Sequence, residues 1–296
     1  MLTQPFRPEG LHTLPPDPAA LAAGADSGEI FTAMCIKCDE LHNLHLDLGS
    51  LRGMIPRDET ALGVREGRVR PIGILSRVGK PVSFQVLGSR SDGTLICSRR
   101  AAQAEAKSYF FSALRPGDIL PVGVQSVTDT GVFCDMGCGF TARIRIDRCC
   151  VSRLQSAKDR FYPGQALRAA ILAIRDDVGQ IDLTHRELLG TWEENAADFA
   201  PGQTVLGIAR SVMPYGIFVE LTPNFSGLAE PTPGIQAGDP VSVYIRGILP
   251  QKHKCKLNIL EKLSCSTLPR DPVYYIRSGH MDRWEYYPGS SAVTYF

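Results

Sequence analysis

The sequence has no long hydrophobic run. The longest apolar stretch near its start, residues 19–23, is far shorter than the roughly 20 residues that a membrane span needs. Prolines rather than basic residues precede that stretch, which does not fit a secretory signal peptide. The net charge is only +1, so a uniformly basic coat for nucleic acid is excluded. Nucleic-acid binding then requires local basic patches, because binding depends on local charge rather than on the sum.

Signatures of catalysis are also lacking. The sequence has no Gly-Lys-Ser phosphate loop, and its six histidines stand in unrelated contexts. A spacing similar to that of zinc ligands occurs at Cys35, Cys38, His42 and His45. The repeat described below aligns both cysteines with apolar positions, so we interpret them as small core residues. We therefore expect no catalytic residue, no metal and no cofactor. The odd number of cysteines, nine, predicts free thiols in a reducing, cytoplasmic setting.

Glycine, by contrast, is abundant and marks a pattern that occurs three times. A glycine, a polar residue and an alternating apolar strand begin at Gly79, Gly164 and Gly238. A further strand, opened by a glycine, precedes each of these at Gly28, Gly117 and Gly202. A short closing strand follows each. Short strands separated by glycines are typical of small β barrels, so the sequence predicts three of them in series.

The predicted barrels span residues 28–100, 117–187 and 202–262. Residues 1–27 are expected to be irregular, and residues 101–116 and 188–201 are expected to be helical linkers. Trp192 in the second linker is expected to be buried against a barrel. Residues 263–296 are rich in tyrosine and predict a packed appendage, with a hairpin that turns at residues 278–280.

Strand alternation predicts which side chains of the second strand of each barrel face solvent. The inward residues of the third barrel are Ile217, Val219 and Leu221. The outward pairs of the three barrels are Phe218 with Glu220, Phe133 with Asp135, and His45 with Asp47. A flat ring is thus placed outside at the same position three times. Such a ring either packs under a neighbouring segment or forms a platform for a nucleic-acid base, where stacking is worth roughly 1–3 kcal/mol.

The closing strands predict different charges on the three outer faces. In the third barrel the outward residues are Lys254 and Lys256, preceded by Lys252. The outward residues of the other two closing strands are Gln180 with Asp182, and Ile96 with Ser98. Only the third barrel therefore combines an outward ring with outward lysines.

Together these motifs resemble the S-one RNA-binding domain, an oligonucleotide-binding (OB) barrel named after the small-subunit ribosomal protein S-one. In the third unit the matching motifs are aromatic-Gly-x-Phe-Val at residues 215–219, Gly-Leu-x-x at 227–230 and Gly-Asp-x-Val at 238–241. The second unit matches at residues 131–133, 164–165 and 182–184, and the first at 53–59. The match covers residues 28–262, and it implies three tandem five-stranded OB-fold barrels with connecting helices.

The resemblance also implies a function, namely non-catalytic binding of single-stranded RNA (mRNA) in association with translation and the small ribosomal subunit, with no membrane partner. The RNA-binding residues that it implies are Tyr215, Phe218, Lys254, Lys256, Arg210, Phe133, Arg143, Arg145 and His45. This sequence departs from the family pattern at Glu230, where many members have histidine, and at His45, which replaces an aromatic residue.

Two other functions compete with RNA binding as interpretations of the sequence. The barrels could form a protein-interaction scaffold that docks on the ribosome or on an RNA-processing assembly with little RNA contact. The near-neutral charge and the acidic outward residues of the second barrel favour this alternative for part of the chain. An RNA-processing enzyme is disfavoured, because barrels over residues 28–262 leave little room for a catalytic domain.

Overall fold

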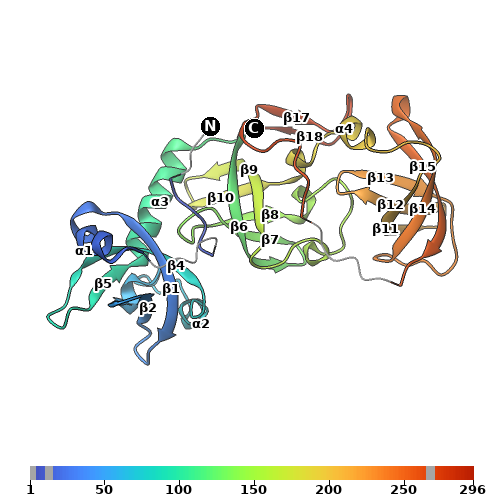
Figure 1. The fold of residues 1–296 in the computed structure, drawn as a ribbon. Helices are drawn as coiled ribbons and strands as arrows, with labels where there is room; N and C mark the ends of the chain where they lie inside the picture. The colour runs from blue at the N-terminus through green and yellow to red at the C-terminus, as the bar shows by residue number, and fades with distance from the viewer. Residues whose placement is uncertain (1–4, 11–15, 265–270) are drawn as a thin grey trace.

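Hydrogen-bonded strands close into three barrels that follow one another along the chain (Figure 1). The computed structural model describes residues 5–10, 16–264 and 271–296. The first barrel has the strand order β1-β2-β3-β5-β4 and closes through pairing of β1 with β4. Its strands are β1 (Ile30–Cys38), β2 (Leu44–Leu48), β3 (Leu51–Ile55), β4 (Pro81–Ser89) and β5 (Leu95–Ser98).

The second and third barrels repeat this strand order and close through the pairs β6–β9 and β11–β14. The second consists of β6 (Asp118–Thr128), β7 (Gly131–Asp135), β8 (Thr141–Arg145), β9 (Ala166–Arg175) and β10 (Gln180–Thr184). The third consists of β11 (Thr204–Met213), β12 (Gly216–Thr222), β13 (Phe225–Ala229), β14 (Pro240–Leu249) and β15 (Lys254–Lys262). The predicted fold class of three tandem five-stranded barrels is confirmed.

Strand register shows that the three barrels are equivalent residue by residue. The first strand of each barrel shifts register against the second strand at the same place, after Cys35, Val124 and Ala209. All three side chains are buried, which confirms that Cys35 takes a core packing position. The eight described cysteines are free thiols. Inward residues of the second strands, such as Leu46, Cys134 and Val219, are buried as alternation predicts.

The N-terminal segment contains a helix, α1 (Pro18–Ser27), so the prediction of an irregular segment is wrong there. The Asp17 side chain accepts a hydrogen bond from the Ala19 N–H, and Pro18 occupies the first turn, where its missing N–H costs nothing. The helix ends at Gly28, whose φ of 66° favours a residue without Cβ. Its Leu21 side chain packs into the core of the first barrel.

The connectors between barrels are only partly the expected helices. The first is α3 (Arg99–Ala113), and Ser98 caps it by accepting a hydrogen bond from Ala101 N–H. This cap buries Ser98, so its predicted outward position is wrong. The second connector is a 3-10 turn, η4 (Arg186–Leu189), followed by the short α4 (Trp192–Ala196). Trp192 is buried against Phe225, with ring centres 5.5 Å apart, as predicted.

The remaining short helical segments are α2 (Pro71–Leu75), η1 (Arg57–Glu59), η2 (Ile146–Arg148), η3 (Ala157–Asp159) and η5 (Pro250–Lys252). None of the helices in the described part of the chain is long and apolar enough to cross a bilayer.

The C-terminal segment packs along the second and third barrels (Figure 1). Its first strand, β16 (Gly279–His280), pairs with β6, so the predicted hairpin turn at residues 278–280 is wrong. The His280 ring holds this pairing, because its Nδ1 lies 2.8 Å from an Asp118 carboxylate oxygen. The hairpin forms further on, between β17 (Arg283–Glu285) and β18 (Val293–Tyr295). Trp284 and Tyr286 are buried in the third-barrel core cluster.

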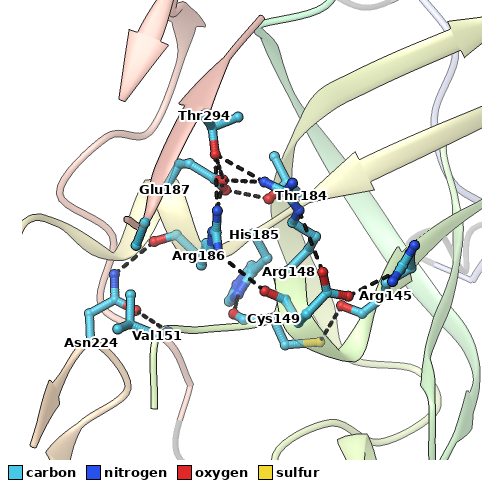
Figure 2. A network of polar contacts seen from close by, with 12 residues as sticks. Arg145, Arg148, Cys149, Val151, Thr184, His185, Arg186, Glu187, Asn224 and Thr294 are labelled. Carbon is cyan, nitrogen blue, oxygen red and sulfur yellow. Dashed lines mark hydrogen bonds and ion pairs between the residues drawn. The ribbon is translucent and has the colours of Figure 1, made fainter. Parts of the chain in front are cut away.

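A buried polar network fixes this hairpin to the end of the second barrel (Figure 2). The Thr294 hydroxyl donates to Glu187 at 2.6 Å and accepts from Arg148 and Arg186 at 3.0 and 3.2 Å. Glu187 is fully buried and ion-paired with both arginines. Nearby, Asn224 of the third barrel donates to the Arg186 carbonyl at 2.7 Å. The second barrel, the third barrel and the C-terminal hairpin therefore share one set of contacts.

A short N-terminal segment joins the first barrel to the second. The Glu9 carboxylate accepts two hydrogen bonds of 2.7 Å from Arg99 and one of 2.9 Å from the Ser83 N–H. The Glu9 N–H donates to the Asp135 carboxylate at 2.7 Å. Asp135 is therefore buried, and its predicted solvent-facing position is wrong because this segment covers it. Burial and the neighbouring Glu9 charge raise the pKa of Asp135 to about 7.

Candidate nucleic-acid interface

One row of side chains crosses the outer face of the third barrel. Strand pairing places Phe218 directly beside Leu228, and Leu228 directly beside Lys256. Phe218 is 36% exposed, Leu228 is 38% exposed, and Lys256 is also exposed. A ring, an apolar side chain and an ammonium group thus share one face. We call Phe218, Leu228 and Lys256 the third-barrel row.

Two further predicted residues flank this row. Tyr215, in the turn before β12, is 65% exposed, and its ring stands at 88° to the Phe218 ring with centres 6.3 Å apart. This edge-to-face arrangement orients the two rings while both keep solvent contact. Lys254 is exposed at the start of β15, two residues before Lys256 and on the same side of the strand. The predicted residues of the third barrel, Arg210 excepted, therefore lie on one outer face.

Gly216 determines where the Phe218 ring lies. A Cβ at residue 216 would stand only 2.6 Å from the Ala229 carbonyl oxygen, so a larger residue would push β12 away from β13. The backbone at Gly216 also has a φ of 156°, which side chains rarely adopt. Because strand side chains alternate, the residue two positions later faces the same side. The Gly-x-Phe spacing in the sequence thus fixes an outward ring beside Leu228.

The second barrel has the same row positions with different chemistry. Phe133 lies beside Arg143, and Arg143 lies beside Asp182. The Arg143 guanidinium is 5.9 Å from the centre of the half-buried Phe133 ring, within the range of a cation–π contact. Asp182, at the position of Lys256, forms an ion pair with Arg175. The face therefore carries both signs of charge.

The other predicted arginine of the second barrel, Arg145, is exposed at the end of β8. Its Nε donates to the Asp147 carboxylate at 3.1 Å. Such an exposed ion pair is weak, so Arg145 can exchange this partner for another anion.

The first barrel lacks a cation in its row. His45 lies beside Met54, and Met54 beside Ile96. The His45 Nε2 is 3.0 Å from an Asp39 carboxylate oxygen. Hydrogen bonds from the Asn43 backbone, with those from the Asn43 and His45 side chains, lower the pKa of Asp39 to about 2. The ring of His45 is thus held beside a permanent negative charge, which does not favour a phosphate.

Arg210 is placed differently from the other predicted residues. It lies at the register shift of β11 and is buried, and its Nε donates to Glu220 at 2.9 Å. Arg160 of the second barrel donates to the same carboxylate at 2.6 and 2.7 Å. Although burial opposes ionisation of Glu220, the two arginines outweigh it and lower the pKa. Arg210 therefore does not lie on the outer face with the other predicted residues. The prediction that Glu220 faces solvent is wrong, because it pairs with Arg210 inside the junction.

The structure therefore brings the predicted residues together in three sets on three barrels. Sequence reasoning missed Leu228 as a member of the interface, although it quoted the Gly-Leu-x-x turn that contains it. Alternation along β13 gives the missing signal, since Phe225, Gly227 and Ala229 are buried and Leu228 between them is not.

The fold and this face define a class of protein, a tandem array of OB-type barrels with an aromatic row on the third barrel. No protein-family model matches the sequence. The chain is 27% identical over 233 residues to small ribosomal subunit protein bS1 of Leuconostoc lactis, covering 73% of this chain and 53% of that protein. It is 30% identical over 156 residues to the bS1 homolog of Bacillus subtilis, covering 51% of this chain and 41% of that protein. The resemblance to the ribosomal protein S-one family is therefore confirmed.

The chain spans about half the length of the curated relatives that it matches. Among solved structures, a multidomain protein with nucleic acid binding domains from Streptococcus pneumoniae aligns over 79% of this chain and 73% of its own. The sequence identity there is 14% and the TM-score is 0.27, too low to establish a common arrangement of the domains.

Proposed function

We propose that the chain binds single-stranded RNA without catalysing a reaction, chiefly through the outer face of the third barrel. The observation that carries this proposal is the third-barrel row, in which the exposed Phe218 ring lies one strand from Leu228 and two strands from Lys256. Every base can stack on such a ring, and only unpaired bases leave a face free to do so. Ammonium groups beside the ring neutralise the backbone phosphates.

We further propose mRNA as the strand and the small ribosomal subunit as the partner. The support is that the relatives with 27% and 30% identity are small ribosomal subunit proteins. The contribution to RNA binding is smaller for Phe133 with Arg143, which lie near Asp182. It is also smaller for His45, which lies beside Asp39.

Fluorescence anisotropy with a labelled twelve-nucleotide oligouridine tests this proposal. The Phe218→Ala, Lys254→Ala double variant should weaken binding more than any pair of changes in the other barrels. The Lys254→Ala, Lys256→Ala variant should make the slope of log affinity against log salt shallower by about 1.4, since each phosphate contact contributes roughly 0.7. An affinity that the first variant leaves unchanged would reject this face as the binding site.

Docking of a protein is a second candidate function, for the second barrel alone. The observation that favours it is the Asp182–Arg175 ion pair in the place that Lys256 occupies in the third barrel. Under this alternative, Phe133→Ala leaves RNA affinity unchanged and weakens association with ribosomal subunits in co-sedimentation.

A further inference from the structure

A cavity of about 280 Å³ lies between the second and third barrels and is lined by residues other than the third-barrel row. Its size is near the lower end of the range for small binding sites, roughly 300–1,000 Å³. Its polar side is the buried cluster of Arg160, Glu220 and Arg210, which joins the two barrels. Because this cluster is tied to both barrels, the cavity is formed before any ligand arrives.

One wall of the cavity is apolar and open to solvent. Leu206, on the outer face of β11, is 53% exposed, and Val273 is 72% exposed. Tyr275 is 37% exposed and donates a hydrogen bond to the Glu194 carbonyl at 3.2 Å, which holds its ring in place. Exposed apolar side chains gathered at a cavity commonly mark an interaction site.

The charges around the cavity favour a cation. Its lining holds two guanidinium groups and four carboxylates. The Arg160 guanidinium is largely buried and that of Arg210 is buried, and both pair with Glu220. Asp159, Asp198 and Asp271 are exposed at the rim, where Asp159 also lies 3.9 Å from Arg210. Two other titratable groups line the cavity, and both are neutral. Burial lowers the pKa of His185 to about 4, and burial raises the pKa of Tyr275. An exposed acidic rim repels phosphate and attracts lysine or arginine.

Gln165 gives an independent indication of the ligand. It lines the cavity and is only 3% exposed, and its Oε1 has no hydrogen-bond partner among the described residues. An unpaired buried carbonyl oxygen is costly unless a donor reaches it. A peptide N–H or a lysine ammonium supplies such a donor, and the phosphodiester group of a nucleic-acid backbone, which has no hydrogen to donate, does not.

We propose that this cavity binds a basic peptide segment of a partner protein. The segment inserts one apolar side chain against Leu206 and Val273, and its flanking lysines or arginines face the rim carboxylates. This interaction uses a different surface from the proposed RNA binding and does not depend on it.

The test titrates the full ¹⁵N-labelled chain with a peptide that has one leucine between two pairs of lysines. The amide signals of Leu206, Ile208 and Val273 should shift. A control peptide with serine in place of leucine should bind about tenfold more weakly, since burying a leucine is worth about 1.5 kcal/mol or more. Equal binding of the two peptides, or shifts confined to other surfaces, would overturn the proposal.

Two variants separate the apolar and charged contributions. Leu206→Ser should weaken peptide binding about tenfold and leave oligouridine affinity unchanged. Asp159→Asn with Asp271→Asn should weaken peptide binding about threefold at low salt and not at high salt, because exposed charges are screened. A urea midpoint near that of the wild type shows that each variant is folded. If oligouridine rather than the peptide shifts the cavity amides, the cavity belongs to an RNA path and the peptide proposal is wrong.

Discussion

The second and third barrels have the same strand order and the same register, yet their outer faces differ. Each places a phenylalanine at the same point of its second strand, Phe133 and Phe218. The neighbours across the next two strands are Arg143 and Asp182 in one barrel, and Leu228 and Lys256 in the other. Backbone geometry therefore supplies the platform, and the side chains on the third and fifth strands decide whether an anionic strand is favoured there.

The acidic residue two positions after the ring of each second strand also has different surroundings in each barrel. Glu220 is buried in the third barrel and stays ionised between two arginines. Asp135 is buried in the second barrel, where its pKa is raised to about 7. Asp47, the equivalent residue of the first barrel, is exposed. One register position thus serves as an inter-barrel ion pair, a buried acid or a solvated surface residue, according to what packs over it.

Removal of the buried carboxylate should have the largest effect. Glu220→Ala leaves Arg160 and Arg210 without their shared partner, so the free energy of unfolding should fall by about 3–5 kcal/mol. Urea denaturation followed by tryptophan fluorescence measures this change. Asp47→Ala is the matched control and should change stability by less than about 0.5 kcal/mol. Equal effects of the two substitutions would show that the junction does not depend on the ion pairs.

Removing the phenylalanine ring from each barrel in turn should show that the outer faces of the second and third barrels contribute unequally to RNA binding. Phe218→Ala should cost about 1–3 kcal/mol of oligouridine binding free energy, the value of one stacked base. Phe133→Ala should cost less, because its ring is half-buried and already contacts Arg143. Anisotropy at one fixed salt concentration compares the two variants directly. A larger loss for Phe133→Ala would reverse the assignment of the principal face.

The barrels and their outward rings could be predicted because they depend on local patterns. Glycine spacing and the alternation around Phe218 can be recognised within short stretches of adjacent residues. The core position of Cys35 follows from its alignment with the other two repeats. Burial of Asp135 and Arg210 could not be predicted in this way. Their partners, Glu9 and Glu220, come from a distant segment and from the next strand, and only the packing of barrels on one another brings in Arg160 as well.

The C-terminal appendage shows the same limit. Its aromatic content predicts a packed segment, and Trp284 and Tyr286 are indeed buried. The position of its hairpin could not be found from Gly279, because β16 forms only by pairing with β6, far earlier in the chain. Patterns within one strand thus predict which side chains point outward, but not which outward side chains another part of the molecule covers.

The buried acid of the second barrel should produce a pH dependence that the third barrel lacks. Because folding raises the pKa of Asp135 to about 7, the folded state binds the proton more tightly than the unfolded state. The resulting stability is complete below about pH 4 and is lost as the pH rises to about 7. Asp135→Asn should therefore flatten the dependence of the melting temperature on pH between about 4 and 7. An unchanged slope in this window would show that Asp135 does not titrate there.

The smallest effect is expected for a substitution that makes the outer face of the second barrel resemble that of the third barrel. Asp182→Lys places a cation where the third barrel has Lys256, beside Arg143 and two strands from Phe133. The substitution removes the ion pair between Asp182 and Arg175, which is exposed and contributes little to stability. Oligouridine affinity at low salt should rise about two- to fivefold, and the salt slope should steepen by about 0.7, as for one added phosphate contact. Asp182→Asn removes the repulsion without adding a cation and should give a smaller rise with no steeper slope. If Asp182→Lys changes neither quantity, the strand does not pass over the second barrel, and RNA binding belongs to the third barrel alone.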